Sequence, residues 1–186
     1  MPTSAGQTYS ATTKVLHWLI ALLMIGLIWL GWYMVDLTYF DKWYNSSLAI
    51  HKSLGMLVLP LAGAKILWAF LSPAPAFVDT IKPWERVAAT STHHVLYFMM
   101  VVIPVTGYAI STSAGSAVSV FDLFDIPAVL PESEGLRDLA VELHYYLSYG
   151  AAMLVAIHTL AALKHQFIEK DGTLSRMWWS WSRSKV

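Results

Sequence analysis

Four apolar stretches, each long enough to cross a lipid bilayer, constrain the fold of this chain more than any other feature. A helix needs roughly 20 apolar residues to span a hydrocarbon core of about 30 Å. Polar or proline-containing segments separate the stretches, so the sequence predicts transmembrane helices over residues 14–35, 48–71, 92–112 and 143–167. We therefore expect an all-α integral membrane four-helix bundle, formed by residues 1–186 as a single domain.

Composition agrees with this interpretation and excludes several kinds of site. The chain is 56% hydrophobic and only 13% charged, whereas an average soluble domain has about 25% charged residues. Its formal net charge is zero, so it has no basic excess with which to bind nucleic acid. It contains no cysteine, which excludes disulfides, thiolate-bound zinc, iron–sulfur clusters and thioether-linked haem. Any haem must therefore be bound non-covalently.

Basic residues gather on one side of the four predicted helices. Only three fall on the other side, namely Lys42, Lys52 and Arg137. The larger group contains Lys14, Lys65, Lys82, Arg86, Lys164, Lys170, Arg176, Arg183 and Lys185. Because cytoplasmic loops carry an excess of Lys and Arg, we expect both termini in the cytoplasm.

Two histidines lie fourteen residues apart in the last apolar stretch, at positions 144 and 158. Fourteen helical residues rise roughly 21 Å and end about 40° short of whole turns, so both side chains lie on nearly the same side. His17 matches His158 in depth, and His51 matches His144. Iron held by two axial histidines keeps no open position and serves electron transfer. The pattern predicts two b-type haems, with iron bound by His17 and His158 and by His51 and His144.

Two alternatives to haem remain for these histidines. His17 and His144 lie close enough to the membrane surfaces to be solvated, and His51 could form a hydrogen bond across helices. Such explanations fit His158 poorly, because ionisable residues deep in membrane helices are rare and usually functional. A zinc or copper site would require ligands at a single depth, whereas these histidines form two layers.

Three further histidines and one lysine are candidates for cofactor contacts. His93 and His94 begin the third predicted helix, where contact with solvent or a haem propionate is favoured over iron ligation. His165 follows His158 by seven residues, which places it on the same helix face and about 10 Å closer to the cytoplasm. With Lys164 it could bind a haem propionate or a quinone carbonyl. The two side chains could equally reach together toward the membrane surface.

Several motifs resemble the bacterial cytochrome b561 family of four-helix, two-haem inner-membrane proteins. They are LHW at 16–18, IHKSLG at 50–55, HHVLYFMMVVIPVTG at 93–107 and IHTLAALKHQFIEKDGTLSRM at 157–177. The resemblance covers essentially the whole chain. It implies haem ligation by His17, His51, His144 and His158, and a multi-pass location in the bacterial inner membrane.

The resemblance also implies an activity, that of a superoxide oxidase. Superoxide would give electrons at the periplasmic face, and ubiquinone would accept them. Relatives can instead be haem subunits that link a partner dehydrogenase or hydrogenase to quinone, and the ligand motifs do not separate these functions.

Charge on the outer loops bears on this choice. These loops contain eight acidic residues, namely Asp36, Asp41, Asp122, Asp125, Glu132, Glu134, Asp138 and Glu142. Their field repels the superoxide anion, so the anion needs a local positive route, for which Lys52 and Arg137 are the strongest candidates. An acidic face would also suit a basic soluble electron donor.

Overall fold

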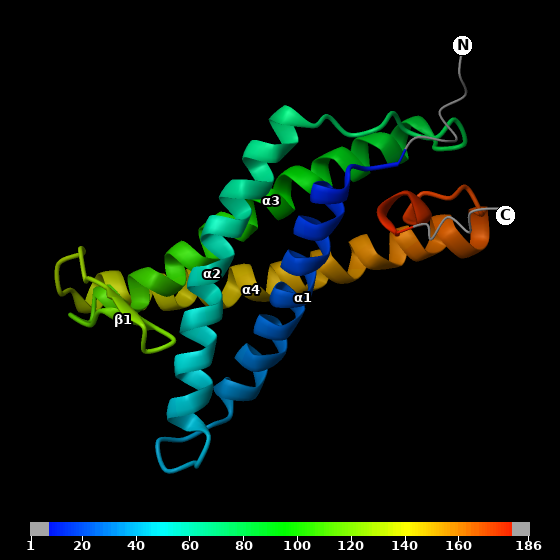
Figure 1. Cartoon of the computed structure of the whole chain (residues 1–186). Coiled ribbons are helices and arrows are strands. Elements are labelled where there is room, and N and C mark those ends of the chain that lie inside the picture. The colour runs from blue at the N-terminus through cyan, green and yellow to red at the C-terminus, as the bar shows by residue number, and fades with distance from the viewer. Residues whose placement is uncertain (1–7, 180–186) are drawn as a thin grey trace, which may run out of the picture.

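The computed structural model describes residues 8–179 and confirms the four long helices (Figure 1). Each is long and apolar enough to cross a membrane. They are α1 (Ala11–Val35), α2 (Tyr44–Leu71), α3 (Pro83–Thr112) and α4 (Glu134–Leu163). A π-helix over Lys164–Glu169 continues α4, and a short 3-10 helix over Leu174–Met177 follows it. Residues 1–7 and 180–186, which include Arg183 and Lys185 from the charge count, lie outside the described residues.

The helices α3 and α4 each begin nine residues earlier than the apolar pattern predicts. Polar residues form these first turns because they satisfy backbone groups at a helix start. The Glu85 carboxylate accepts the backbone N–H of Lys82 at 3.0 Å, and Pro83 occupies the first helical position. Ser133 Oγ accepts the N–H of Leu136 at 3.3 Å. The apolar stretches thus mark the lipid-crossing part of each helix rather than its full length.

A small β-hairpin occupies part of the connection between α3 and α4. Its antiparallel strands are β1 (Val118–Val120) and β2 (Phe124–Ile126). Phe121 and Asp122, in the turn, have positive φ angles of 52° and 57°. Ser53 of α2 accepts the N–H of Phe121 at 2.9 Å. The hairpin is therefore fixed to α2 close to His51.

Both described chain ends lie at the same end of the bundle (Figure 1). The N–H of Tyr9 donates to the carbonyl of Arg176 at 3.3 Å. Trp18 Nε1 donates to the carbonyl of Met177 at 3.0 Å. We call this the terminal end, comprising residues 8–13, the 72–82 connection and residues 170–179. The opposite end of the bundle contains residues 36–43 and 113–133, and we call it the hairpin end.

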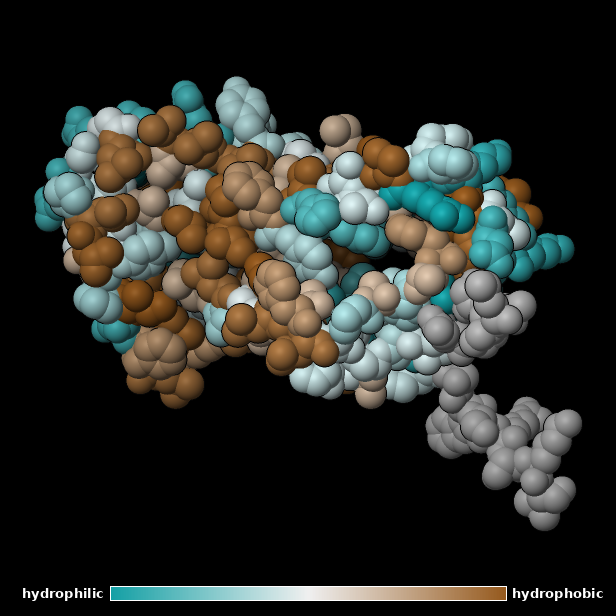
Figure 2. Space-filling view, turned by 90° about the horizontal axis from the view of Figure 1, so that it is seen from above, coloured by the Kyte–Doolittle hydropathy of each residue, from teal (hydrophilic) through white to brown (hydrophobic). Residues whose placement is uncertain are grey.

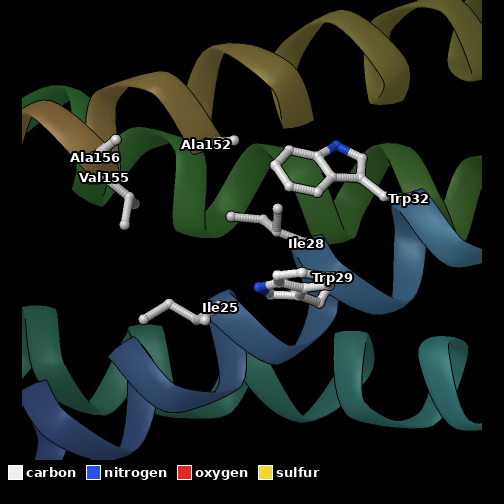
Figure 3. Close-up of a pocket in the computed structure, with 7 residues that line it drawn as sticks. All are labelled: Ile25, Ile28, Trp29, Trp32, Ala152, Val155 and Ala156. Atoms are coloured by element: carbon white, nitrogen blue, oxygen red, sulfur yellow. The ribbon is translucent and has the colours of Figure 1, made fainter.

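The helices pack in chain order, α1 on α2, α2 on α3 and α3 on α4, whereas α1 and α4 make few contacts. A core formed by Ile20, Ala62 and Met100 joins the first three helices. Where α1 and α4 face each other, their side chains line a pocket of about 140 Å³ (Figure 3). Its lining is apolar and consists of Ile25, Ile28, Trp29, Trp32, Ala152, Val155 and Ala156. The pocket leaves room between α1 and α4 for an apolar group.

Every long helix leaves large apolar side chains exposed, among them Leu22, Leu67, Phe98 and Met153. Figure 2 shows apolar side chains over much of one face and hydrophilic ones toward the ends. In a bilayer such side chains contact lipid rather than water. The structure is thus a multi-pass membrane bundle.

Candidate functional site

At the terminal end, a histidine of α1 faces a histidine of α4. The ring centres of His17 and His158 lie 6.3 Å apart. Two imidazoles that bind one metal ion from opposite sides, with bonds of about 2 Å, have ring centres roughly 6 Å apart. His93 of α3 is closer to His158, at 5.3 Å between ring centres, and this distance is too short for two rings that bind one ion from opposite sides. Spacing therefore favours His17 over His93 as the partner of His158. His94 is exposed.

At the hairpin end, His51 of α2 faces His144 of α4 with ring centres 6.2 Å apart. This separation matches that of the other pair. The four histidines thus lie as two opposed pairs rather than one cluster, which disfavours a single zinc or copper site built from all four.

A carbonyl of α3 orients the His144 ring. The Nδ1 atom of His144 lies 3.0 Å from the Ile103 carbonyl oxygen. Because a carbonyl can only accept, Nδ1 carries the proton and Nε2 is left free to bind a metal. Thr106 Oγ1 donates to the same carbonyl at 2.8 Å and lies 3.1 Å from Nδ1. Hydrogen bonds of this kind fix the orientation of metal-binding histidines.

Two glycines leave room for the rings at the hairpin end. A Cβ atom at Gly107 would lie 3.1 Å from Cε1 of His144. One at Gly31 would lie 3.5 Å from Cε1 of His51. Gly55, one turn after His51, borders open space instead. Sequence reasoning had given no role to Gly107, Gly31, Thr106 or the Ile103 carbonyl, although the motif at 93–107 contains three of these four residues.

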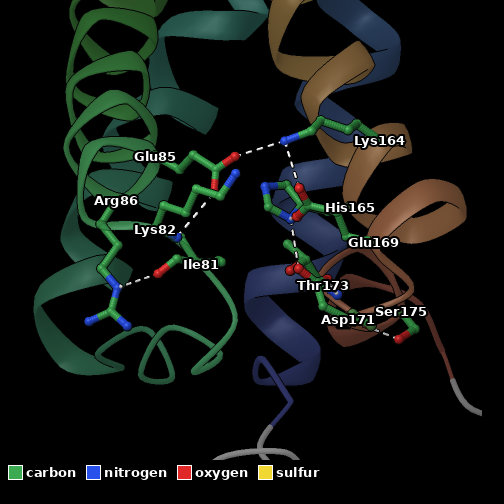
Figure 4. A network of polar contacts seen from close by, with 11 residues as sticks. Ile81, Lys82, Glu85, Arg86, Lys164, His165, Glu169, Asp171, Thr173 and Ser175 are labelled. Carbon is green, nitrogen blue, oxygen red and sulfur yellow. Dashed lines mark hydrogen bonds and ion pairs between the residues drawn. The ribbon is translucent and has the colours of Figure 1, made fainter.

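A polar network surrounds His165 at the terminal end (Figure 4). Lys164 Nζ lies 2.7 Å from Glu85 and 2.8 Å from Glu169. His165 Nδ1 lies 2.6 Å from Asp171 and 2.8 Å from Glu169. Glu85, His165 and Glu169 could converge on a metal ion, but the Lys164 ammonium group already forms an ion pair with each of the two carboxylates. The contacts favour a proton-holding cluster over a metal site.

The carboxylate of Asp171 stays ionised in this network. Burial alone would raise its pKa, but hydrogen bonds from Thr173 and His165 outweigh burial and bring the pKa below its usual value. The sequence prediction that His165 shares a helix face with His158 assumed α-helix throughout. That assumption is wrong, because the α-helix ends at Leu163 and the π-helix that follows changes the residue spacing per turn.

The two basic residues expected to guide superoxide lie on different helices. Lys52 is half-buried on α2, and Arg137 is exposed near the start of α4. Within residues 8–179, no ion pair, hydrogen bond or ring contact joins them. Nearby, Thr38 donates two hydrogen bonds to Asp41, which lower the pKa of that carboxyl. The carboxylate of Asp41, in the 36–43 connection, therefore stays ionised.

Comparison with known proteins decides the family. A sequence model described as "Prokaryotic cytochrome b561" matches residues 8–180. The chain belongs to this family. Cytochrome b561 proteins are four-helix membrane bundles that bind b-type haem and carry electrons.

Individual members of the cytochrome b561 family align over nearly the whole chain. Cytochrome b561 homolog 2 of Escherichia coli (strain K12) is 38% identical over 175 residues, which cover 94% of this chain and 93% of that protein. A protein of Yersinia pestis named "Probable superoxide oxidase CybB" is 30% identical over 178 residues, covering 91% and 94%. Cytochrome b561 homolog 1 of E. coli is 29% identical over 172 residues, covering 91% and 96%.

The histidine pairs of this cytochrome b561 suit b-type haem. The Nδ1 atom of His51 is buried and has no hydrogen-bond partner among the described residues. In residues 8–179, no hydrogen bond to His17 or His158 is found either. Buried polar groups normally have partners, and a metal bound to the ring supplies one.

We expect Gly107→Ala to displace the His144 ring, because the added methyl group would press on a ring that the Ile103 carbonyl holds. The affinity of the His144 site for b-type haem should fall about 10- to 100-fold, the range for changes that misorient metal ligands, while the His17–His158 pair is unaffected. Haem content per protein after detergent dialysis measures this. Gly26→Ala is the matched control, because a Cβ there meets nothing within 4 Å. Equal haem content in both variants would contradict the expectation.

Proposed function

We propose that this cytochrome b561 binds two haems and oxidises superoxide at the hairpin end while reducing ubiquinone. Two superoxide anions each lose one electron and become dioxygen. Ubiquinone takes up both electrons and two protons and becomes ubiquinol. The observation that carries the proposal is the presence of two opposed imidazole pairs, one on α1 and α4 and one on α2 and α4, with ring centres 6.3 and 6.2 Å apart.

In this proposal His17 and His158 bind the iron of one haem, and His51 and His144 bind that of the other. When bound, the haems supply one-electron carriers at two depths of the membrane. The chain's own contribution is to hold the two rings of each pair about 6 Å apart, to keep the proton of His144 on Nδ1, and to exclude water with the apolar residues between α1 and α4. His93 packs against His158 and is proposed as a propionate contact rather than a ligand.

The proposed orientation places the terminal end in the cytoplasm and the hairpin end in the periplasm. The distribution of Lys and Arg supports it, and the hydrogen bonds between residues 9–18 and 176–178 agree with termini on one side. We propose the bacterial inner membrane as the location, with the lipid bilayer as a partner of the exposed apolar side chains.

Superoxide is the proposed substrate because a relative at 30% identity is named a probable superoxide oxidase. Lys52 and Arg137 remain the proposed positive groups for the approach of this anion. Lys52 is adjacent to His51 in sequence, so it lies next to the histidine pair at the hairpin end.

The acidic charge of the hairpin end favours a second candidate function. In that alternative the chain is a non-catalytic haem subunit, and it passes electrons to quinone from a basic soluble donor or from a partner dehydrogenase or hydrogenase. Co-purification of such a partner would support the alternative. A stable haem protein without companions would support the enzyme.

Rapid mixing of the oxidised, purified protein with a pulse of superoxide tests the activity. We expect the reduced-haem spectrum to form faster than superoxide dismutates, and to decay when ubiquinone is added. The His51→Ala and His144→Ala proteins are the controls, since both remove a ligand at the hairpin end. Haems that stay oxidised under superoxide but respond to dithionite would contradict the enzyme and leave the electron-transfer subunit.

Single ligand substitutions test the pairing. Each haem should be lost with either of its two ligands, so His17→Ala and His158→Ala should give one identical residual spectrum. His51→Ala and His144→Ala should give the other. The pairing fails if any of these proteins keeps both haems. Loss of a haem in His93→Ala would make His93 a ligand.

His165 and Lys164 are the proposed quinone contacts, although a haem propionate could bind the same two side chains. Only 12% of the His165 side chain is exposed, and Asp171 and Glu169 hold its Nδ1 proton. The ring can therefore offer a proton from Nε2 when it is doubly protonated. We expect His165→Ala to leave both haem spectra intact and to slow ubiquinone-dependent haem reoxidation about 100-fold, the lower range for loss of an acid catalyst. Unchanged quinone kinetics would refute this role.

A further inference from the structure

A buried lysine lies inside α2 at the level of the histidine pair of the terminal end. Lys65 is six residues before the end of α2 at Leu71, about 9 Å along the helix axis. Only 9% of its surface is exposed. Charged side chains at such depth are costly in a membrane, and those that occur face the bundle interior and pair with a partner.

Lys65 has no counter-charge within residues 8–179. No carboxylate and no hydrogen-bond acceptor is found for its Nζ atom, which lies 5.7 Å from the centre of the Tyr97 ring. Two other lysines are satisfied. Lys14, 6% exposed, donates to the carbonyl of Trp178 at 3.0 Å, and Lys164 has two carboxylates. Lys65 therefore stands out as a buried cation without a partner of opposite charge.

The direction of the Lys65 side chain makes it unfavourable for its ammonium group to reach the membrane surface. Helical side chains tilt toward the N-terminus of their helix, and α2 runs from the hairpin end to the terminal end. Lys65 thus leans away from the nearer membrane surface. The contact with Tyr97 agrees, because Tyr97 packs against the core cluster of Ile20, Ala62 and Met100.

Lys65 lies beside the site proposed for the terminal-end haem. Tyr97 and His93 are four residues apart on α3, so they share one face of that helix. The ring of His93 contacts that of His158 at 5.3 Å. The charge of Lys65 acts on both His17 and His93. Lys65 thus lies close to the histidines of the terminal end, and no carboxylate among residues 8–179 pairs with it.

We propose that Lys65 binds a propionate carboxylate of the haem held between His17 and His158. The inference rests on the two-haem proposal above. A b-type haem carries two carboxylates, and a carboxylate in an apolar interior needs a cation and hydrogen-bond donors. An ammonium group supplies one positive charge and three donors. It also favours the reduced iron, because a positive charge opposes the extra charge of the oxidised form.

Redox titration of two Lys65 variants tests the inference. Lys65→Met removes the charge at similar size, and Lys65→Arg keeps it. In Lys65→Met, the reduction equilibrium of the haem that His17→Ala loses should shift at least tenfold toward the oxidised form, which is 59 mV for one electron. The other haem should keep its potential. Because Lys65→Arg keeps the charge, this variant should have a potential close to that of the wild type. Equal shifts at both haems, or no shift, would overturn the inference.

Reconstitution of the wild-type apoprotein keeps the test decisive if Lys65→Met does not fold. Haem b and its dimethyl ester, which lacks carboxylates, are compared at both sites. We expect the ester to bind at least tenfold more weakly than haem b at the terminal-end site, with a smaller loss at the hairpin-end site. Equal binding of the two compounds at the terminal-end site would overturn the inference. A wild-type protein with only one haem would instead refute the two-haem proposal itself.

Discussion

The cost of an unsatisfied polar group inside a membrane is the constraint on which the rest of this structure depends. Each buried imidazole or ammonium group must find a partner, because lipid supplies none. His144 finds a backbone carbonyl on α3. His17, His51 and His158 find no hydrogen bond among the described residues, and Lys65 finds no carboxylate. Groups left without a partner therefore concentrate where we propose that haem binds, and a cofactor with iron and carboxylates would complete both kinds at once.

The arrangement of the helices follows from the same requirement. A bundle of four tightly packed helices would press α1 against α4 and leave no space between opposed rings. Here α2 and α3 carry the packing, while α1 and α4 make few contacts and face each other across an apolar pocket. Gly107 keeps space free in the same way, since a Cβ atom there would press on the His144 ring. The protein consequently buries few of its own apolar side chains, and lipid and the cofactor cover the others.

The spanning segments and the depth of each histidine could be predicted from sequence, because apolar length and helical rise are properties of the chain alone. The early starts of α3 and α4 could not, since the apolar pattern ends where the helices leave the lipid. The partner of His144 is a backbone carbonyl, which no residue type signals. The angle expected for His165 assumed a constant number of residues per turn. The π-helix after Leu163 changes that number, and the apolar pattern gives no sign of it. The contacts of Lys65 needed three helices to be placed together.

The two histidine pairs differ in their surroundings, and on the proposed assignment this difference sets a direction for electrons. At the hairpin end, the hydrogen bond from His144 to the Ile103 carbonyl makes the ring a more basic ligand, which favours oxidised iron. At the terminal end, the buried charge of Lys65 beside His17 and His93 favours reduced iron. Both effects lower the potential at the hairpin end relative to the terminal end. Electrons that arrive beside Lys52 would therefore move downhill toward the network of Lys164 and His165, where protons are held for a quinone.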